Sequence, residues 1–199
     1  MDVEVPVLYL TQPKAVRLMN TVWADRTSVH DSLETLAHLQ LWAERAGVGD
    51  GQVDESDLAL ARELRDALRR LAADATHDDR RGAVSAGVDT EAALAVTNRF
   101  LADCTPVLRH ESGQDFRRGW REDGASSFRR DLAALALEGA GLLAGQGLRA
   151  CGGPGCVLYF VRSHSRREWC SAECGNRARV ARHYQRKRDG DPVDTQPGT

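Results

Sequence analysis

Residues 151–156 read Cys151-Gly152-Gly153-Pro154-Gly155-Cys156, and thirteen residues later the chain continues Cys170-Ser171-Ala172-Glu173-Cys174. Structural zinc sites take four tetrahedral ligands, and two short-range cysteine pairs joined by a small loop can supply them. The segment is too short to fold around an apolar core of its own, so a bound metal would hold it together. We therefore predict a Zn²⁺ site with the ligands Cys151, Cys156, Cys170 and Cys174.

The residues around the four cysteines predict a treble-clef-like finger. The glycine-rich first pair suits a turn that bends around a metal, and the run 157–161 is rich in residues that favour strands. Ser171 is placed to begin a helix that we expect to reach residue 188. Redox chemistry is the alternative use of four clustered cysteines, but this spacing favours a metal.

The run Cys174-Gly175-Asn176-Arg177 resembles the signature of the CGNR zinc finger, a small bacterial module named for these four residues. Trp169 and the pairs Arg166-Arg167 and Tyr159-Phe160 also match that family. In the family the finger follows a larger ABATE domain, and the segment 16–22, with its Asn20-Thr21 pair, resembles the opening helix of that domain. The resemblance implies a stress-induced transcription regulator.

The charges divide unevenly along the chain, whose net charge is −2. Residues 149–199 hold 10 Lys and Arg against 5 Asp and Glu, whereas residues 1–148 hold 17 against 24. A basic module on an acidic body is typical of a nucleic-acid contact attached to a regulatory domain. A generally arginine-rich surface is the plainer explanation.

The helix predicted over 171–188 separates into two faces at 100° per residue. We expect Cys174, Ala178, Ala181 and Tyr184 to face the metal and the strands. The opposite face is basic and free to reach DNA. With two loop arginines, the predicted nucleic-acid-binding residues are Arg166, Arg167, Arg179, Arg182 and Arg186. For Arg177 we favour a structural role over DNA contact, by hydrogen bonding or by stacking on Trp169.

The rest of the chain predicts a mainly α fold. Apolar periodicity and capping residues indicate helices over residues 13–25, from 31 to a stop at Gly47, from 54 or 56 onward, from 89 or 90 onward, and over 126–145. Residues 106–120 alternate and predict a short β-hairpin. The predicted domains are a helical regulatory domain (1–147), the finger (148–188) and a disordered tail (189–199).

Polar and aromatic residues on the helix faces suggest a ligand pocket, lined by Asn20, Trp23, Trp42 and Asn98. The alternative is that such residues anchor helices to loops by hydrogen bonds. Cys104 has helical spacing with Phe100 and predicts a buried structural cysteine. We find no catalytic set of residues and predict that the chain is not an enzyme.

Residues 1–10 do not resemble a signal peptide, and no apolar run approaches the roughly 20 residues that span a bilayer. These features predict a cytoplasmic protein. The leading hypothesis is a zinc-containing, DNA-binding transcription regulator that acts as a homodimer or with a partner regulator. The alternative is a protein-interaction adaptor whose finger binds an acidic partner without touching DNA.

Overall fold

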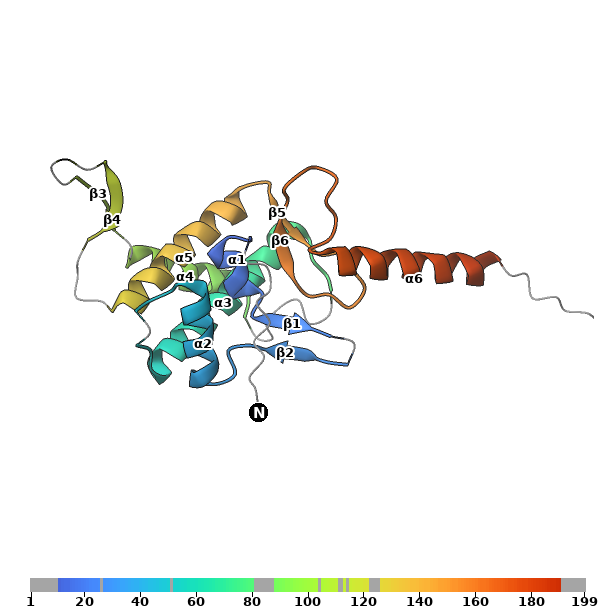
Figure 1. Cartoon of the computed structure of the whole chain (residues 1–199), viewed down its shortest axis with the longest axis horizontal. Coiled ribbons are helices and arrows are strands. Elements are labelled where there is room, and N and C mark those ends of the chain that lie inside the picture. Colours follow the sequence, from blue (N-terminus) through green and yellow to red (C-terminus); the bar gives the residue numbers. More distant parts are fainter. Residues whose placement is uncertain are drawn as a thin grey trace, which may run out of the picture.

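The computed structural model describes residues 11–25, 27–50, 52–80, 88–103, 105–110, 113, 115–121 and 126–190. Within these residues the chain forms six helices and three two-stranded antiparallel sheets, which confirms the mainly α class (Figure 1). The elements, in chain order, are α1 (Lys14–Met19), β1 (Val22–Ala24), β2 (Val29–Asp31), α2 (Leu36–Ala46), α3 (Glu55–Thr76), α4 (Thr90–Ala102), β3 (Pro106–Arg109), β4 (Arg117–Trp120), α5 (Ser127–Ala144), β5 (Leu148–Ala150), β6 (Tyr159–Val161) and α6 (Ala172–Gly190).

The long helix α3 lies at the centre of the helical part and packs against α1, α4 and α5. Its predicted apolar stripe is buried from Leu58 to Leu71, with Leu64 and Leu68 fully enclosed, whereas Ala75 at its end is exposed. Asp54 caps its N-terminus, because the Asp54 carboxylate accepts from the backbone N–H groups of Ser56 and Asp57. The caps and the 3.6-residue period thus fix this helix locally, and its neighbours bury the apolar face.

The predicted hairpin over 106–120 is present as β3 and β4, with Val107 opposite Gly119 and Leu108 opposite Arg118. It extends from the helical part at the end of the molecule away from α6 (Figure 1).

The predicted first helix over 13–25 is wrong in its second half. Helix α1 ends at Met19, and residues 22–31 form the hairpin β1–β2, in which Trp23 lies opposite His30. Thr21, Val22 and Trp23 are β-branched or aromatic and favour a strand. The Asp25 carboxylate accepts from the N–H groups of Thr27 and Ser28, which closes the turn between the strands.

The predicted start of the second helix near Asp31 is also wrong. Asp31 ends β2, and its carboxylate is engaged by the Leu33 N–H and by the Arg65 guanidinium. Thr35 caps α2 instead, through a hydrogen bond from the His38 N–H to its hydroxyl. The helix ends as predicted, at Gly47 in the left-handed conformation with φ 60°.

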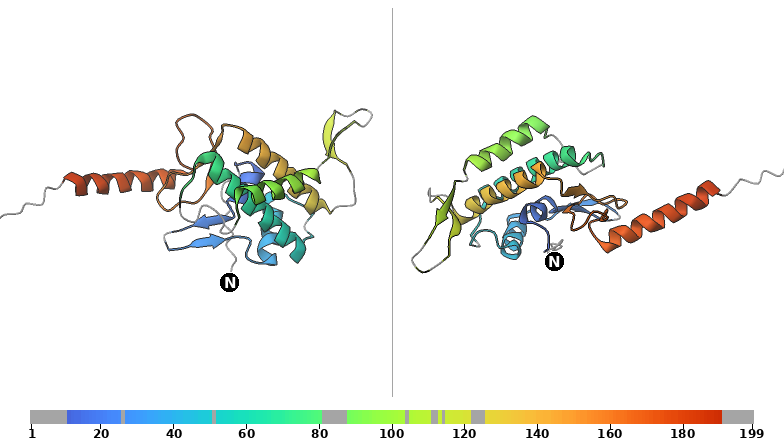
Figure 2. Two further views of the ribbon diagram at one scale, coloured as in Figure 1. Left: turned by 180° about the vertical axis from the view of Figure 1, so that it is seen from behind. Right: turned by 90° about the horizontal axis from the view of Figure 1, so that it is seen from above.

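The strand pair β5–β6 joins the finger to the helical part. Leu148 and Tyr159 are buried in the same apolar cluster as the leucines of α1, α3 and α5. Beyond this junction α6 projects away from the rest of the molecule, as the two views of Figure 2 show. Residues 191–199 of the predicted disordered tail lie outside the described residues, as do residues 1–10 and Cys104.

Among the described residues, no helix is both long enough and apolar enough to cross a bilayer.

Candidate metal centre

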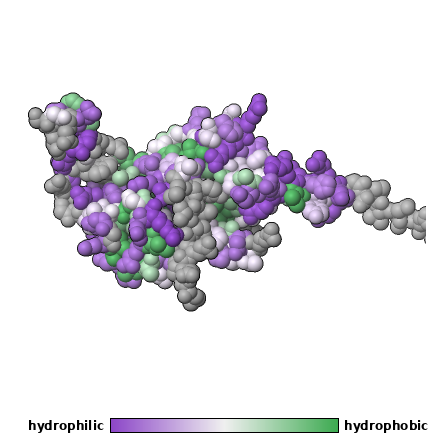
Figure 3. All heavy atoms as spheres, viewed as in Figure 1, coloured by the Kyte–Doolittle hydropathy of each residue, from purple (hydrophilic) through white to green (hydrophobic). Residues whose placement is uncertain are grey.

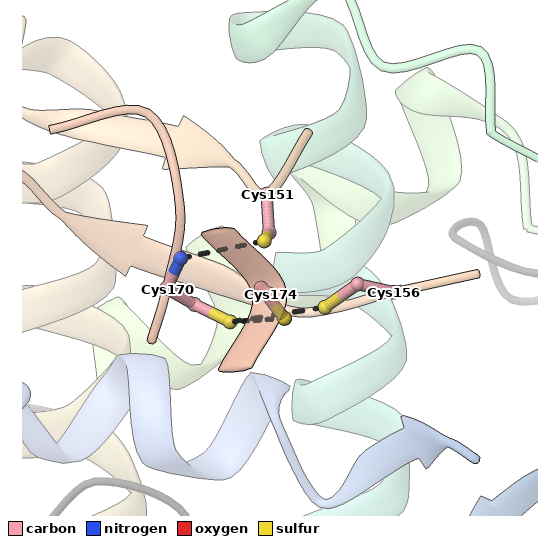
Figure 4. A group of neighbouring side chains, drawn as sticks. All are labelled: Cys151, Cys156, Cys170 and Cys174. Carbon is pink, nitrogen blue, oxygen red and sulfur yellow. Dashed lines mark hydrogen bonds between the residues drawn. The ribbon is translucent and has the colours of Figure 1, made fainter. Parts of the chain in front are cut away.

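The four predicted ligands converge on one point. Their sulfur atoms all lie within 4.8 Å of one another, and all four side chains are buried and free of disulfides (Figure 4). The Sγ atoms of Cys156 and Cys170 are 3.8 Å apart, and those of Cys170 and Cys174 are 3.5 Å apart. Tetrahedral Zn–S bonds of about 2.3 Å would place neighbouring sulfurs about 3.8 Å apart. The cluster therefore fits a tetrahedral metal ion with four sulfur ligands.

Each cysteine is positioned by a different local feature. Cys151 follows β5, and Cys156 comes at the end of the glycine-rich turn. Cys170 precedes α6 and Cys174 lies in its first turn, where the Cys174 N–H donates to the Ser171 hydroxyl at 3.2 Å. Free amide groups and the helix dipole at this end favour thiolates.

The turn needs glycine at position 153 because it passes against α6. A Cβ atom on Gly153 would lie 2.8 Å from the Cβ atom of Cys174, closer than two such atoms can approach. Gly152 has more room, since a Cβ there would meet only the Glu168 carbonyl at 4.0 Å. The close packing of turn and helix brings the two cysteine pairs together.

Nearby donors stabilise the thiolates. The Cys170 N–H lies 3.3 Å from the Cys151 sulfur, and the Arg177 guanidinium donates to the Cys174 sulfur at 3.0 Å. Hydrogen bonds from Cys151 and the other two thiols, together with the one from Arg177, lower the pKa of Cys174 well below its ordinary value. Arg177 thus has the structural hydrogen bond that we favoured. It is Arg182 that stacks on Trp169, with its guanidinium 5.7 Å from the ring centre.

Residues outside the finger support the backbone of the metal ligands, and Arg80 makes the main contacts. The Arg80 guanidinium donates to the carbonyl oxygens of both Cys151 and Cys156 at 2.8 Å. Asp78 holds Arg80 in place through two hydrogen bonds of 2.6 Å and accepts a third from the Tyr159 hydroxyl at 2.9 Å. Burial opposes ionisation of Asp78, but the hydrogen bonds from Arg80 outweigh it and lower the pKa of Asp78.

Arg69 on α3 makes a second bridge to the finger. It is fully buried, and its guanidinium donates to the carbonyl of Met19 at 2.7 Å and to that of Val157 at 3.3 Å. The guanidinium also lies 5.4 Å from the centre of the Tyr159 ring. Burial lowers the pKa of Arg69 to about 10. Sequence reasoning missed Arg69 and Arg80, because a single arginine among many carries no local signal of a partner far along the chain.

The residues of the predicted ligand pocket lie in different surroundings. Asn20 is buried, and its amide makes two hydrogen bonds of 2.9 Å with the backbone N–H and carbonyl of Tyr159. Trp23 is partly buried against the finger, and Trp42 is buried in the helical core. Asn98 is exposed on α4. Asn20 thus has the anchoring role weighed as the alternative.

The predicted nucleic-acid-binding arginines divide into two groups. Arg166, Arg179, Arg182 and Arg186 are exposed. Arg167 is turned inward: its guanidinium donates to the carbonyls of Trp169 at 3.1 Å and Cys170 at 2.6 Å.

The predicted inner face of the last helix is only partly correct. Cys174 and Ala178 are buried, but Ala181 and Tyr184 are exposed. The reason is that α6 leaves the finger after Ala178: Arg182 still lies over Trp169, but no helix or strand that the structure describes packs closely against residues 179–188. We call these residues the arm.

Two family models match the chain. Residues 13–146 match ABATE, whose description is "Putative stress-induced transcription regulator". Residues 148–187 match the CGNR zinc finger, which contains all four clustered cysteines. No curated protein matches the sequence. Because the first match spans well over half of its length, the chain belongs to the ABATE family and carries a CGNR zinc finger at its C-terminal end.

Proposed function

We propose that this chain is a DNA-binding transcription regulator whose finger is held by one Zn²⁺ ion bound to Cys151, Cys156, Cys170 and Cys174. Four buried thiols within 4.8 Å of one another, in a segment that matches a zinc finger, support the choice of metal. A site closed by four protein ligands is structural. The ion would hold the turn 151–156 against the start of α6. The proposal gives the chain no catalytic role.

The observation that carries the DNA-binding proposal is the exposed arm. Every residue of the arm is exposed, and over its ten residues the helix extends about 15 Å. The major groove of B-DNA, about 12 Å wide, admits an α-helix of this kind. The face of α6 seen in Figure 3 is mainly hydrophilic.

Arg179, Arg182 and Arg186 lie on one face of the arm because they recur at spacings of three and four. They also line a hollow of about 670 Å³ together with Trp169 and Gln185. Arg166, exposed on the loop before α6, can extend this face. We leave Arg167 out of the DNA-binding surface, because its guanidinium is bonded within the finger.

The second candidate function, a protein-interaction adaptor, is favoured by two exposed apolar residues. Val180 is 54% and Tyr184 is 64% exposed on α6, one turn apart. A protein partner could cover these two residues. We favour DNA binding, because the opposite face of the arm carries three arginines that can contact phosphates. We propose that the protein is cytoplasmic. We also propose that it binds DNA as a homodimer or with a partner regulator, because the small contact surface of one arm would bind DNA only weakly.

The test is a DNA-binding titration with the full-length, zinc-loaded protein and mixed-sequence duplex DNA. The triple variant Arg179→Ala/Arg182→Ala/Arg186→Ala should lose most of the affinity and keep its zinc. The matched control is Lys187→Ala/Arg188→Ala, which removes charge from the same helix on another face and should have a smaller effect. If the triple variant binds DNA as tightly as the wild type, the adaptor function replaces this proposal.

A further inference from the structure

A groove of about 510 Å³ lies between the strands of the finger, the turn 151–156 and the first turns of α6. We call it the knuckle groove. Trp169 and Arg182 border both this groove and the hollow along the arm, but the other residues that line the two hollows differ. Of the DNA contacts assigned above, only Arg182 also lines this groove. Its main lining residues are Arg149, Pro154, Phe160, Arg162, Arg167 and Arg182.

The charge of the knuckle groove is strongly positive. Four arginine side chains line it, and Glu168 is the acidic residue among the lining residues. Arg167 is bonded to backbone carbonyls within the finger, and one carboxylate needs only one arginine, so the remaining arginines favour a ligand with more than one negative charge. Guanidinium groups bind phosphate oxygens in a forked, two-bond geometry that an ammonium group cannot reproduce.

Among the residues that line the groove, Arg162 is the one with a buried nitrogen that lacks a hydrogen bond. Its Nε atom is shielded from solvent and makes no hydrogen bond within the part of the chain that the structure describes. A buried donor without an acceptor is costly, and a bound anion would supply the acceptor. Arg162 follows β6, whose strand is held to Gln12 and β5, so its backbone is firmly placed.

The size and floor of the groove describe the rest of the ligand. Four apolar residues also line the groove, and we call them its apolar floor: Ala150, Pro154, Phe160 and Ala178. A volume of about 510 Å³ lies in the range of small-molecule sites and is far larger than an inorganic phosphate needs. The ligand should therefore combine phosphate groups with an apolar or aromatic body.

We propose that the knuckle groove binds an organic phosphate ester, such as a nucleotide, with its phosphates on Arg149 and Arg162 and its body on the apolar floor. The site shares only Arg182 with the duplex contact on the arm. Because the groove lies against the turn that holds two of the four cysteines, a bound ligand would stabilise the finger. The same chemistry is offered by a free nucleotide and by the 5′-phosphorylated end of a nucleic-acid strand.

The test is calorimetric titration of the full-length, zinc-loaded protein with ATP, AMP, adenosine and inorganic phosphate. ATP should bind most tightly and AMP next, with adenosine and phosphate much weaker. Arg162→Gln and Arg149→Gln should each weaken ATP binding by about tenfold to a hundredfold, the range for lost hydrogen bonds to a charged group. Zinc content and the melting temperature show whether each variant is folded, and Arg162→Lys should restore part of the affinity.

Arg186→Gln is the matched control, because Arg186 lines the hollow along the arm and not the knuckle groove. It should leave ATP binding unchanged and weaken duplex binding, so the two proposals can fail separately. If a 5′-phosphorylated oligonucleotide displaces ATP and its 5′-hydroxyl counterpart does not, the natural ligand is the end of a nucleic-acid strand. If neither oligonucleotide displaces ATP, the natural ligand is a free phosphate ester. The proposal is overturned if no organic phosphate binds at about 1 mM, or if folded Arg162→Gln binds ATP like the wild type.

Discussion

Replacing Arg80 by Gln should weaken both the fold and the metal site, although Arg80 is not a metal ligand. The substitution removes the donors to the carbonyls of Cys151 and Cys156 and leaves Asp78 without its charged partner. The side chain of Asp78 is 1% exposed, whereas that of Arg80 is 21% exposed. Breaking a buried ion pair costs about 3–5 kcal/mol, because the remaining charge is buried and uncompensated.

We expect the lower end of that range for Arg80→Gln, about 3 kcal/mol, because Arg80 is partly solvated and Asp78 keeps the hydrogen bond from Tyr159. Zinc affinity should also fall, by about tenfold to a hundredfold, as is usual when a residue that supports the ligands is lost. Denaturant unfolding of the zinc-loaded protein measures the first effect, and competition with a chromophoric chelator measures the second.

A double-mutant cycle with Asp78→Asn separates the ion pair from the carbonyl contacts. The Asp78→Asn/Arg80→Gln protein should be more stable than the sum of the single effects predicts, by about 2 kcal/mol, because no unpaired charge remains. Its zinc affinity should stay low, since the carbonyls still lack their donor. If the free energy of unfolding of Arg80→Gln lies within about 0.5 kcal/mol of the wild-type value and zinc binds equally well, Arg80 does not support the metal ligands.

Four further substitutions test other parts of the structure. Cys174→Ser should abolish stoichiometric zinc by elemental analysis and lower the melting temperature of the helical part as well, because Leu148 and Tyr159 of the finger belong to the main core. Gly153→Ala should weaken zinc binding because its Cβ would meet Cys174, whereas Gly152→Ala should bind zinc normally; equal affinities would contradict the packing at the turn. Asn20→Ala leaves the N–H and carbonyl of Tyr159 unpaired and should lower the free energy of unfolding by about 2–3 kcal/mol, as measured with denaturant. A change below about 0.5 kcal/mol would show that the Asn20 side chain does not anchor Tyr159.

Local signals were sufficient for much of the fold. The period of α3, its Asp54 cap and the stop at Gly47 are set by residues within a few positions of one another, and the structure has them as predicted. The spacing of the cysteines likewise predicts a cluster, because each pair lies within one turn or one helix start. The short hairpin β1–β2 was missed because Val22 and Trp23 continue the apolar pattern of α1 without a helix-breaking residue.

The contacts between the finger and the helical part could not be predicted from the sequence. Asn20 and Tyr159 are 139 positions apart, and Arg80 and Cys151 are 71 apart. Nothing near any of these residues indicates its partner. The exposed arm was missed for a related reason. The helical projection that placed Tyr184 inward assumes that the whole helix packs against the finger, but the buried residues of α6 end at Ala178.

The salt dependence of DNA binding by the full-length, zinc-loaded protein tests the central claim most directly. Phosphate contacts release counterions, so the logarithm of the association constant should fall with the logarithm of salt concentration. Four contacts from Arg166, Arg179, Arg182 and Arg186 predict a slope of about −3 to −4 per chain, and Arg182→Glu should make that slope shallower without loss of zinc. A slope near zero, or one that Arg182→Glu leaves unchanged, would contradict DNA binding by the arm.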